Sequence, residues 1–165
     1  MTLNTAAESM DGDMVISFGD ILFRRYILSS LLDLEDDIAI AVDGEWSQRN
    51  GNRLGFQDLV QASSPHSLGY TTEEVWLQKM APEFADEVQG EWIGLMRCSE
   101  SGTATIKSAV AQLSEREDFD QLHLFDLFNH LIEQGHKIRV LYITGHWLDV
   151  DNLDDLAKAQ SFQTA

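Results

Sequence analysis

The stretch MVISFGD, at residues 14–20, and the stretch IAIAVDG, at residues 38–44, decide the fold class of this chain. Each is an apolar run too short for a helix, and each ends in an aspartate beside a glycine. Between them, residues 21–34 carry apolar side chains at helical spacing. A strand, a helix and a second strand, with both strands apolar throughout, predict a βαβ unit whose parallel sheet is buried on both faces.

The rest of the chain extends this α/β pattern without an internal repeat or a domain linker. Residues 45–70 are polar and predict a long loop with one strand near residues 59–62. Strands expected at residues 75–80 and 91–98 would pair antiparallel around the connection between them. The remaining predictions are a short helix over 2–10, helices over 103–113 and 122–134 with Gly135 as a stop, a strand over 138–143, and a helix over 153–159 capped by Asn152.

Composition excludes several classes of protein. The chain has 165 residues, with 11 Lys and Arg against 28 Asp and Glu, a net charge of −17 that disfavours binding to nucleic acid. Cys98 is the single cysteine, so there is no intrachain disulfide and no cysteine-based zinc cluster. No run of 18 apolar residues and no signal peptide occurs, so we expect a protein of the cytoplasm with no membrane association.

Three carboxylates follow predicted strands, where ligands bind in α/β sheets. Asp20 follows the first strand, and Asp149 and Asp151 follow the last. If these strand ends lie together, Asp20 and Asp151 would face one cleft and could hold a hard cation such as Mg²⁺. The alternative is that Asp20 and Asp151 only cap helices that begin directly after them.

Most of the other polar or reactive side chains are predicted to be structural. The exception is His146, which lies in a turn near the acidic pair and is the one histidine considered as a site candidate. Trp147 is expected in the core, with stacking on a ligand as the alternative. The rest are Asp43 as a turn residue, Arg24 and Arg25 as solvated or ion-paired rather than phosphate-binding, His123 and His130 as structural, and Cys98 as a buried small side chain.

Three stretches carry a resemblance to a known family. Residues 15–23 resemble the strand with the metal-binding aspartate of nucleotidyltransferases of the sugar-nucleotide and cytidylyltransferase type. Residues 145–156 resemble that family's second metal motif, and residues 90–95 resemble its strand over the acceptor pocket. The likeness is greatest to the nucleotidyltransferase domains fused to phosphoenolpyruvate phosphomutases in phosphonate biosynthesis.

This resemblance implies a three-layer α/β domain with a mixed sheet, the carboxyl-terminal part of a glycosyltransferase-A-like nucleotidyltransferase. The implied reaction joins a nucleoside triphosphate, with CTP as the expected donor, to a phosphate or phosphonate acceptor such as an aminoalkylphosphonate. By resemblance, Asp20 and Asp151 bind Mg²⁺ or another divalent cation, and Asp149 contacts it indirectly or through water. Glu91 and Trp92 border the acceptor, whereas no residue is assigned to the nucleotide.

Members of this family also have a Gly-rich phosphate loop before the first of these motifs, and this sequence has none. We therefore expect residues 1–165 to form a single incomplete domain, through truncation, a misplaced gene start or a split gene, that is inactive alone. A sheet edge left open would favour self-association or an N-terminal partner polypeptide. The alternative function is a non-catalytic remnant or interaction subunit that retains only the acceptor and metal half.

Overall fold

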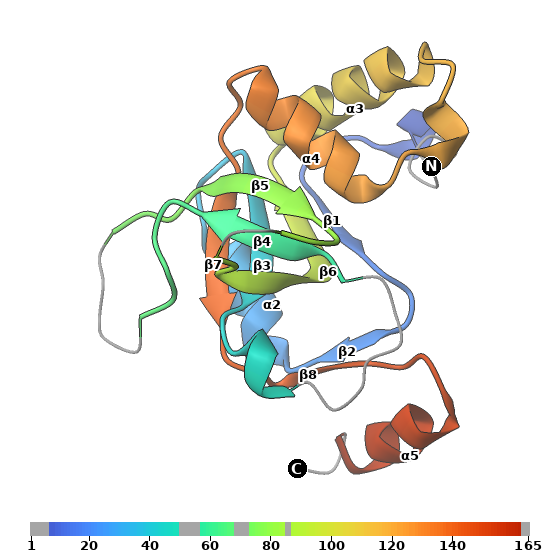
Figure 1. Cartoon of the computed structure of the whole chain (residues 1–165). Helices are drawn as coiled ribbons and strands as arrows, with labels where there is room; N and C mark the ends of the chain where they lie inside the picture. Colours follow the sequence, from blue (N-terminus) through green and yellow to red (C-terminus); the bar gives the residue numbers. More distant parts are fainter. Residues whose placement is uncertain (1–6, 50–56, 68–72, 85–86, 163–165) are drawn as a thin grey trace.

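The computed structural model describes residues 7–49, 57–67, 73–84 and 87–162 (Figure 1). The strands are β1 (Met14–Ser17), β2 (Ile21–Phe23), β3 (Ile38–Asp43), β4 (Leu59–Ala62), β5 (Leu77–Ala81), β6 (Gly90–Cys98), β7 (Arg139–Ile143) and β8 (Trp147–Asp149). The helices are α2 (Arg25–Leu32), α3 (Glu100–Ser114), α4 (Leu124–Glu133) and α5 (Leu153–Phe162), with 3₁₀ turns η1 (Ala7–Ser9), η2 (Trp46–Arg49) and η3 (Phe119–Gln121).

The central sheet is mixed and has six strands. Its main path runs β5-β4-β6-β3-β7, and β1 pairs with β6 off this path. Only the β3–β7 pair is parallel, and the other described pairs of this sheet are antiparallel. The strand β3 is buried along its whole length, as its apolar sequence predicts.

Three layers form because β3 presents a different cluster of side chains to each face. Ile38, Ile40 and Val42 pack into one core cluster with the buried side chains of α3 and α4. Ala39 and Ala41 point to the other face and pack against Ile27 and Leu31 of α2, together with Trp147. This alternation is the two-residue period of a strand. The predicted α/β class with a three-layer mixed sheet is confirmed.

The strands β1 and β3 run in the same direction, as the predicted βαβ unit requires, but they are not neighbours in a parallel sheet, because β6 lies between them and is antiparallel to both. The side chains of β1 also alternate between half-buried and exposed, so this strand is not buried on both faces. Its apolar sequence indicated a strand correctly, but strand pairing is set by partners far along the chain.

Two other predicted elements differ from the structure for the same reason. Residues 21–34 are not one helix, because β2 pairs with β8 and the helix α2 begins only at Arg25. The strands β5 and β6 are not partners, because β4 lies between them. The helix predicted over residues 2–10 falls largely outside the described residues, of which Ala7–Ser9 form a 3₁₀ turn.

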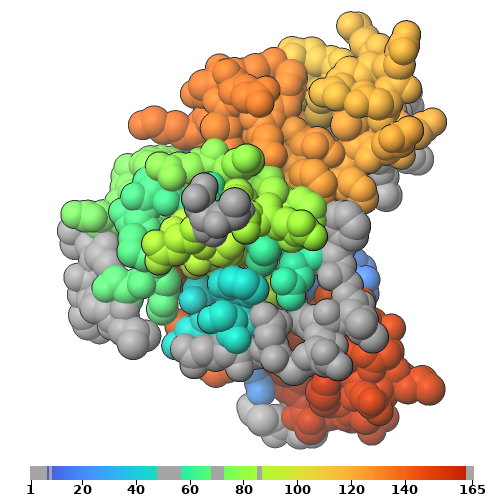
Figure 2. Space-filling view, in the orientation of Figure 1, coloured from blue at the N-terminus to red at the C-terminus, as the bar shows by residue number. Residues whose placement is uncertain are grey.

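A second, two-stranded sheet of β2 and β8 lies beyond the end of the main sheet, and α5 follows it. Figure 2 shows α5, in red, apart from the yellow and orange helices α3 and α4. We call the β2–β8 pair the acidic ribbon, because Asp20 precedes β2 while Asp149 ends β8. Within the described residues, no helix has the length and apolar character needed to span a membrane.

Candidate functional site

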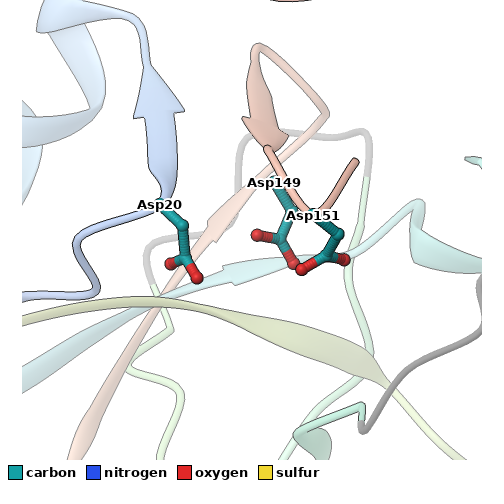
Figure 3. Close-up of side chains that lie close together, drawn as sticks. All are labelled: Asp20, Asp149 and Asp151. Carbon is teal, nitrogen blue, oxygen red and sulfur yellow. The ribbon is translucent and has the colours of Figure 1, made fainter. Parts of the chain in front are cut away.

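Three carboxylates meet at one end of the acidic ribbon (Figure 3). One oxygen from each of Asp20, Asp149 and Asp151 lies within 4.8 Å of the others. Asp20 and Asp151 are exposed, and Asp149 is half-buried. Carboxylate oxygens are the ligands that hard divalent cations prefer. Their spacing is close to that of a single coordination shell, so the cluster fits such an ion and stands open to solvent.

The ribbon brings these residues together through its backbone. Ile21 pairs with Asp149, and the Val150 amide donates to the Asp20 carbonyl oxygen at 2.9 Å. The expected proximity of Asp20 and Asp151 is confirmed. The strands of the central sheet that precede them, β1 and β7, run in the same direction, but that sheet is mixed and not parallel, and the acidic ribbon makes the direct contact. Binding of a cation by these two residues stays a prediction.

Helix capping does not explain these aspartates. Asp20 precedes the strand β2 and not a helix. The helix α5 is capped by Asn152, whose Oδ1 accepts from the amides of Asp154 at 2.9 Å and Asp155 at 3.0 Å. The predicted cap at Asn152 is therefore confirmed.

Asp43 has a larger role than that of a turn residue. Its carboxyl group is fully buried at the end of β3 and accepts from the Trp147 indole Nε1 at 2.8 Å. It also accepts from the backbone amides of Glu45 at 3.0 Å and Gly145 at 3.2 Å. The sequence signal for this role is an aspartate that ends an apolar strand. The sequence does not show its partners, because two of them lie about 100 residues away in the chain.

The turn before β8 has an unusual backbone. Gly145 and His146 both have positive φ, at 64° and 59°. For a non-glycine residue this conformation is uncommon. The His146 ring nitrogen Nδ1 lies 2.8 Å from the Tyr26 hydroxyl. Burial, and then the charge of Asp43, raise the pKa of Tyr26, so this hydroxyl stays protonated near neutral pH.

Glu91 and Trp92, the predicted acceptor residues, lie in the interior on β6. Trp92 is 3% exposed, and its ring makes edge contacts with Phe18 and Phe128. Its Nε1 donates to the Leu95 carbonyl at 3.0 Å. Glu91 is 6% exposed and pairs with Asp43 across the β3–β6 ladder. Contact with an acceptor is untested for both residues.

The predicted burial of Trp147 and Cys98 is confirmed, and the roles predicted for His130 and Arg24 stay predictions. Trp147 is buried, and Cys98 is buried with a thiol pKa raised to about 12 by desolvation. The His130 Nε2 lies 3.1 Å from the Gln112 amide oxygen, and the Arg24 guanidinium lies 4.7 Å from the centre of the Phe162 ring. A separate hollow of about 650 Å³ lies beside β7, and none of the three clustered aspartates lines it.

The chain is similar to known proteins that transfer nucleotides. No family model matches the chain. The chain is 25% identical over 153 residues to the CTP:phosphoglutamine cytidylyltransferase of Campylobacter jejuni. That match covers 87% of this chain and 57% of the relative, so the chain spans somewhat more than half of the relative's length.

Solved structures share the fold at lower identity. The inositol-1-phosphate CTP transferase of T. maritima matches with a TM-score of 0.69 at 15% identity, covering 99% of this chain and 60% of that one. A CTP:phosphocholine cytidylyltransferase from Streptococcus pneumoniae matches with a TM-score of 0.60 at 12% identity, covering 98% and 62%. The chain therefore has a nucleotidyltransferase fold and a cytidylyltransferase-like sequence.

Proposed function

We propose that this chain carries the metal-binding part of a cytidylyltransferase that transfers CMP from CTP to a small acceptor. The acceptor oxygen would belong to a phosphate or phosphonate group and would attack the α-phosphorus of CTP, breaking its bond to the departing pyrophosphate. The observation that supports this best is the cluster of Asp20, Asp149 and Asp151 on a nucleotidyltransferase fold. The similarity to a CTP-dependent relative favours cytosine over the other bases.

The residues have distinct proposed roles at this site. Asp20 and Asp151 are the exposed carboxylates, and they would hold Mg²⁺ or another divalent cation directly. Asp149 is half-buried and would contact the ion through water or support the other ligands. A bound divalent cation would neutralise phosphate charge and orient the triphosphate. Such an ion is needed here because the chain, at a net charge of −17, repels CTP.

We further propose that residues 1–165 transfer little nucleotide by themselves. Triphosphates are held by backbone amides and cationic side chains of a Gly-rich loop, and this sequence contains no such loop. A second polypeptide segment would supply it. The acceptor would be an aminoalkylphosphonate, with the chain working beside a phosphoenolpyruvate phosphomutase in the cytoplasm. The second candidate function is a non-catalytic subunit that retains only the acceptor and metal half.

The decisive experiment joins this chain to a segment of its curated relative. The part of the C. jejuni relative outside the matched region would be fused to residues 1–165, and pyrophosphate release would be measured with CTP, Mg²⁺ and a panel of acceptors. The panel contains phosphoglutamine, phosphocholine and 2-aminoethylphosphonate. We expect release with CTP and not with UTP, and loss of release in the Asp151→Asn variant. A folded fusion that binds metal but releases no pyrophosphate would favour the non-catalytic subunit.

A further inference from the structure

The buried Asp43 carboxyl group connects the central sheet to the acidic ribbon. It lies at the end of β3, and its relative exposure is 0%. Its Oδ2 accepts from the Trp147 indole at 2.8 Å, and its Oδ1 accepts from the Gly145 amide at 3.2 Å. These two donors lie on either side of His146, whose positive φ is unfavourable for a side-chain-bearing residue. Asp43 therefore fixes the strained turn from which β8 starts.

The chemistry of this contact requires both carboxylate oxygens. The donors are an indole N–H and the backbone N–H groups of Gly145 and Glu45, and none of them can accept a hydrogen bond. An asparagine has the same shape but only one acceptor oxygen. Its amide N–H₂ would face a donor in either orientation, so one side of the contact would be lost.

The acidic ribbon depends on such anchors because it is small. It has two strands of three residues each, and isolated two-stranded ribbons are marginally stable in water. Trp147, which Asp43 holds, pairs with Phe23 at one end of the ribbon. Asp149 pairs with Ile21 at the other end, two residues further along β8. A shift at Trp147 is therefore transmitted directly along β8 to Asp149 and Asp151.

We propose that Asp43 is a positioning residue, which holds β8 in place and through it sets the geometry of the Asp20, Asp149 and Asp151 cluster. The part of this inference that concerns metal affinity rests on the proposed function. Asp43 itself would not contact the ion, because its oxygens are fully buried and accept from the turn before β8.

The first test measures the ribbon without any metal. Hydrogen exchange of the Val150 amide, which donates to the Asp20 carbonyl, reports whether the ribbon is closed. We expect the Asp43→Asn and Trp147→Phe variants to accelerate this exchange relative to the amides of α3. The matched control is Thr103→Val, which removes another buried side-chain hydrogen bond, to the Gly12 carbonyl at 2.7 Å. The control should leave the ribbon amides unchanged.

The second test measures the affinity for Mn²⁺ by titration of the 165-residue chain. We expect Asp43→Asn to weaken Mn²⁺ binding about tenfold, the lower end of what loss of a group that orients metal ligands causes. Thr103→Val should bind as the wild type does. If Asp43→Asn does not fold, Trp147→Phe carries both tests, because it removes the indole donor and keeps an aromatic ring in the core.

The outcomes separate this inference from the proposed function. One outcome would overturn only the positioning role of Asp43: the wild-type chain binds Mn²⁺, and the ribbon amides of Asp43→Asn exchange as slowly as those of the wild type. The positioning role is also wrong if amide exchange in Asp43→Asn rises equally in α3 and in the ribbon. It is wrong as well if the wild type binds Mn²⁺ and Asp43→Asn binds it equally tightly. A wild-type chain that binds no Mn²⁺, with ribbon exchange selectively raised in Asp43→Asn, would refute the metal site and keep the role of Asp43 in holding β8.

Discussion

The Val150 amide donates a hydrogen bond to the Asp20 carbonyl oxygen at 2.9 Å, across the acidic ribbon. This backbone contact joins two acidic segments from opposite ends of the sequence. It allows the side chains of Asp20 and Asp151 to point into the same space (Figure 3). The cluster is thus built by strand pairing and not by a favourable interaction between carboxylates, which repel one another when no cation is present.

The first prediction concerns the cluster itself. The Asp20→Asn and Asp151→Asn variants should each weaken Mn²⁺ binding by at least about tenfold, because loss of a ligand should cost no less than loss of a group that orients one. Calorimetric titration measures the affinity. Asp154→Asn is the control, since Asp154 is exposed in the first turn of α5, outside the cluster, and its change removes the same single charge. Equal weakening in the control would mean that general negative charge, not a site, attracts the ion.

Local sequence patterns predict part of this site, and the rest depends on contacts between distant parts of the chain. The apolar run of residues 38–42 indicates a buried strand, and the structure has β3 there. The residues of the cluster follow from their positions beside apolar runs. Helical spacing misplaces residues 21–23, because β2 is stabilised by β8, which lies more than a hundred residues away. The sequence predicts only a turn residue at Asp43 for the same reason, because the hydrogen-bond donors at Gly145 and Trp147 are close to it in space and far from it in the chain.

The second prediction concerns Gly94, which has a φ of 81° and lies against the Phe18 ring. An added Cβ in Gly94→Ala would overlap that ring, and the backbone conformation alone should lower the free energy of unfolding by about 1–3 kcal/mol. Chemical denaturation measures the loss.

Two other glycines separate the cost of the backbone conformation from the cost of steric overlap with an added Cβ. Gly12 has a φ of 60° with nothing within 4 Å of an added Cβ, and Gly19 has the same open space with no positive φ. We expect Gly94→Ala to be the most destabilising, Gly12→Ala to show the backbone cost only, and Gly19→Ala to be close to neutral. A Gly94→Ala variant no less stable than Gly12→Ala would show that Phe18 moves aside freely.

The third prediction concerns the pH dependence of stability. Burial raises the pKa of the Asp58 carboxyl from 3.8 to about 6, although the nearby His123 lowers it in part. Between these two values the folded state binds more protons than the unfolded state, so this group makes stability fall as pH rises from about 4 to 6. Above pH 6 the ionised group destabilises the fold, by on the order of 3 kcal/mol.

Asp58→Asn removes this ionisation. The variant should be more stable than the wild type at pH 7, and the gain should shrink and vanish as pH falls below about 4. Urea unfolding at pH 4, 5.5 and 7 measures it, with the exposed Asp120→Asn as control. A stability difference that stays constant from pH 4 to 7 would show that the Asp58 carboxyl titrates normally.

The fourth prediction concerns self-association through β1. Among the described strands β1 pairs with β6, and its Val15 side chain is 41% exposed, with Phe18 just beyond it at 36%. Strand edges with exposed apolar side chains promote pairing between chains. The net charge of −17 opposes association, but about 0.15 M salt screens charges beyond roughly 8 Å and leaves apolar contact intact. We therefore expect light scattering to show dimers or larger species in moderate salt.

A charge placed on this edge should reverse the effect. Val15→Lys introduces a strand-edge lysine, a residue that natural sheets use to block such pairing, and should shift the chain toward monomer. Leu32→Lys is the matched control, because Leu32 is also exposed, at 51%, but lies on α2. Both changes reduce the net negative charge by one, so a difference between them cannot come from overall repulsion. Equal scattering by the two variants, or a monomeric wild type in salt, would place the association elsewhere or show that β1 is already protected in the folded chain.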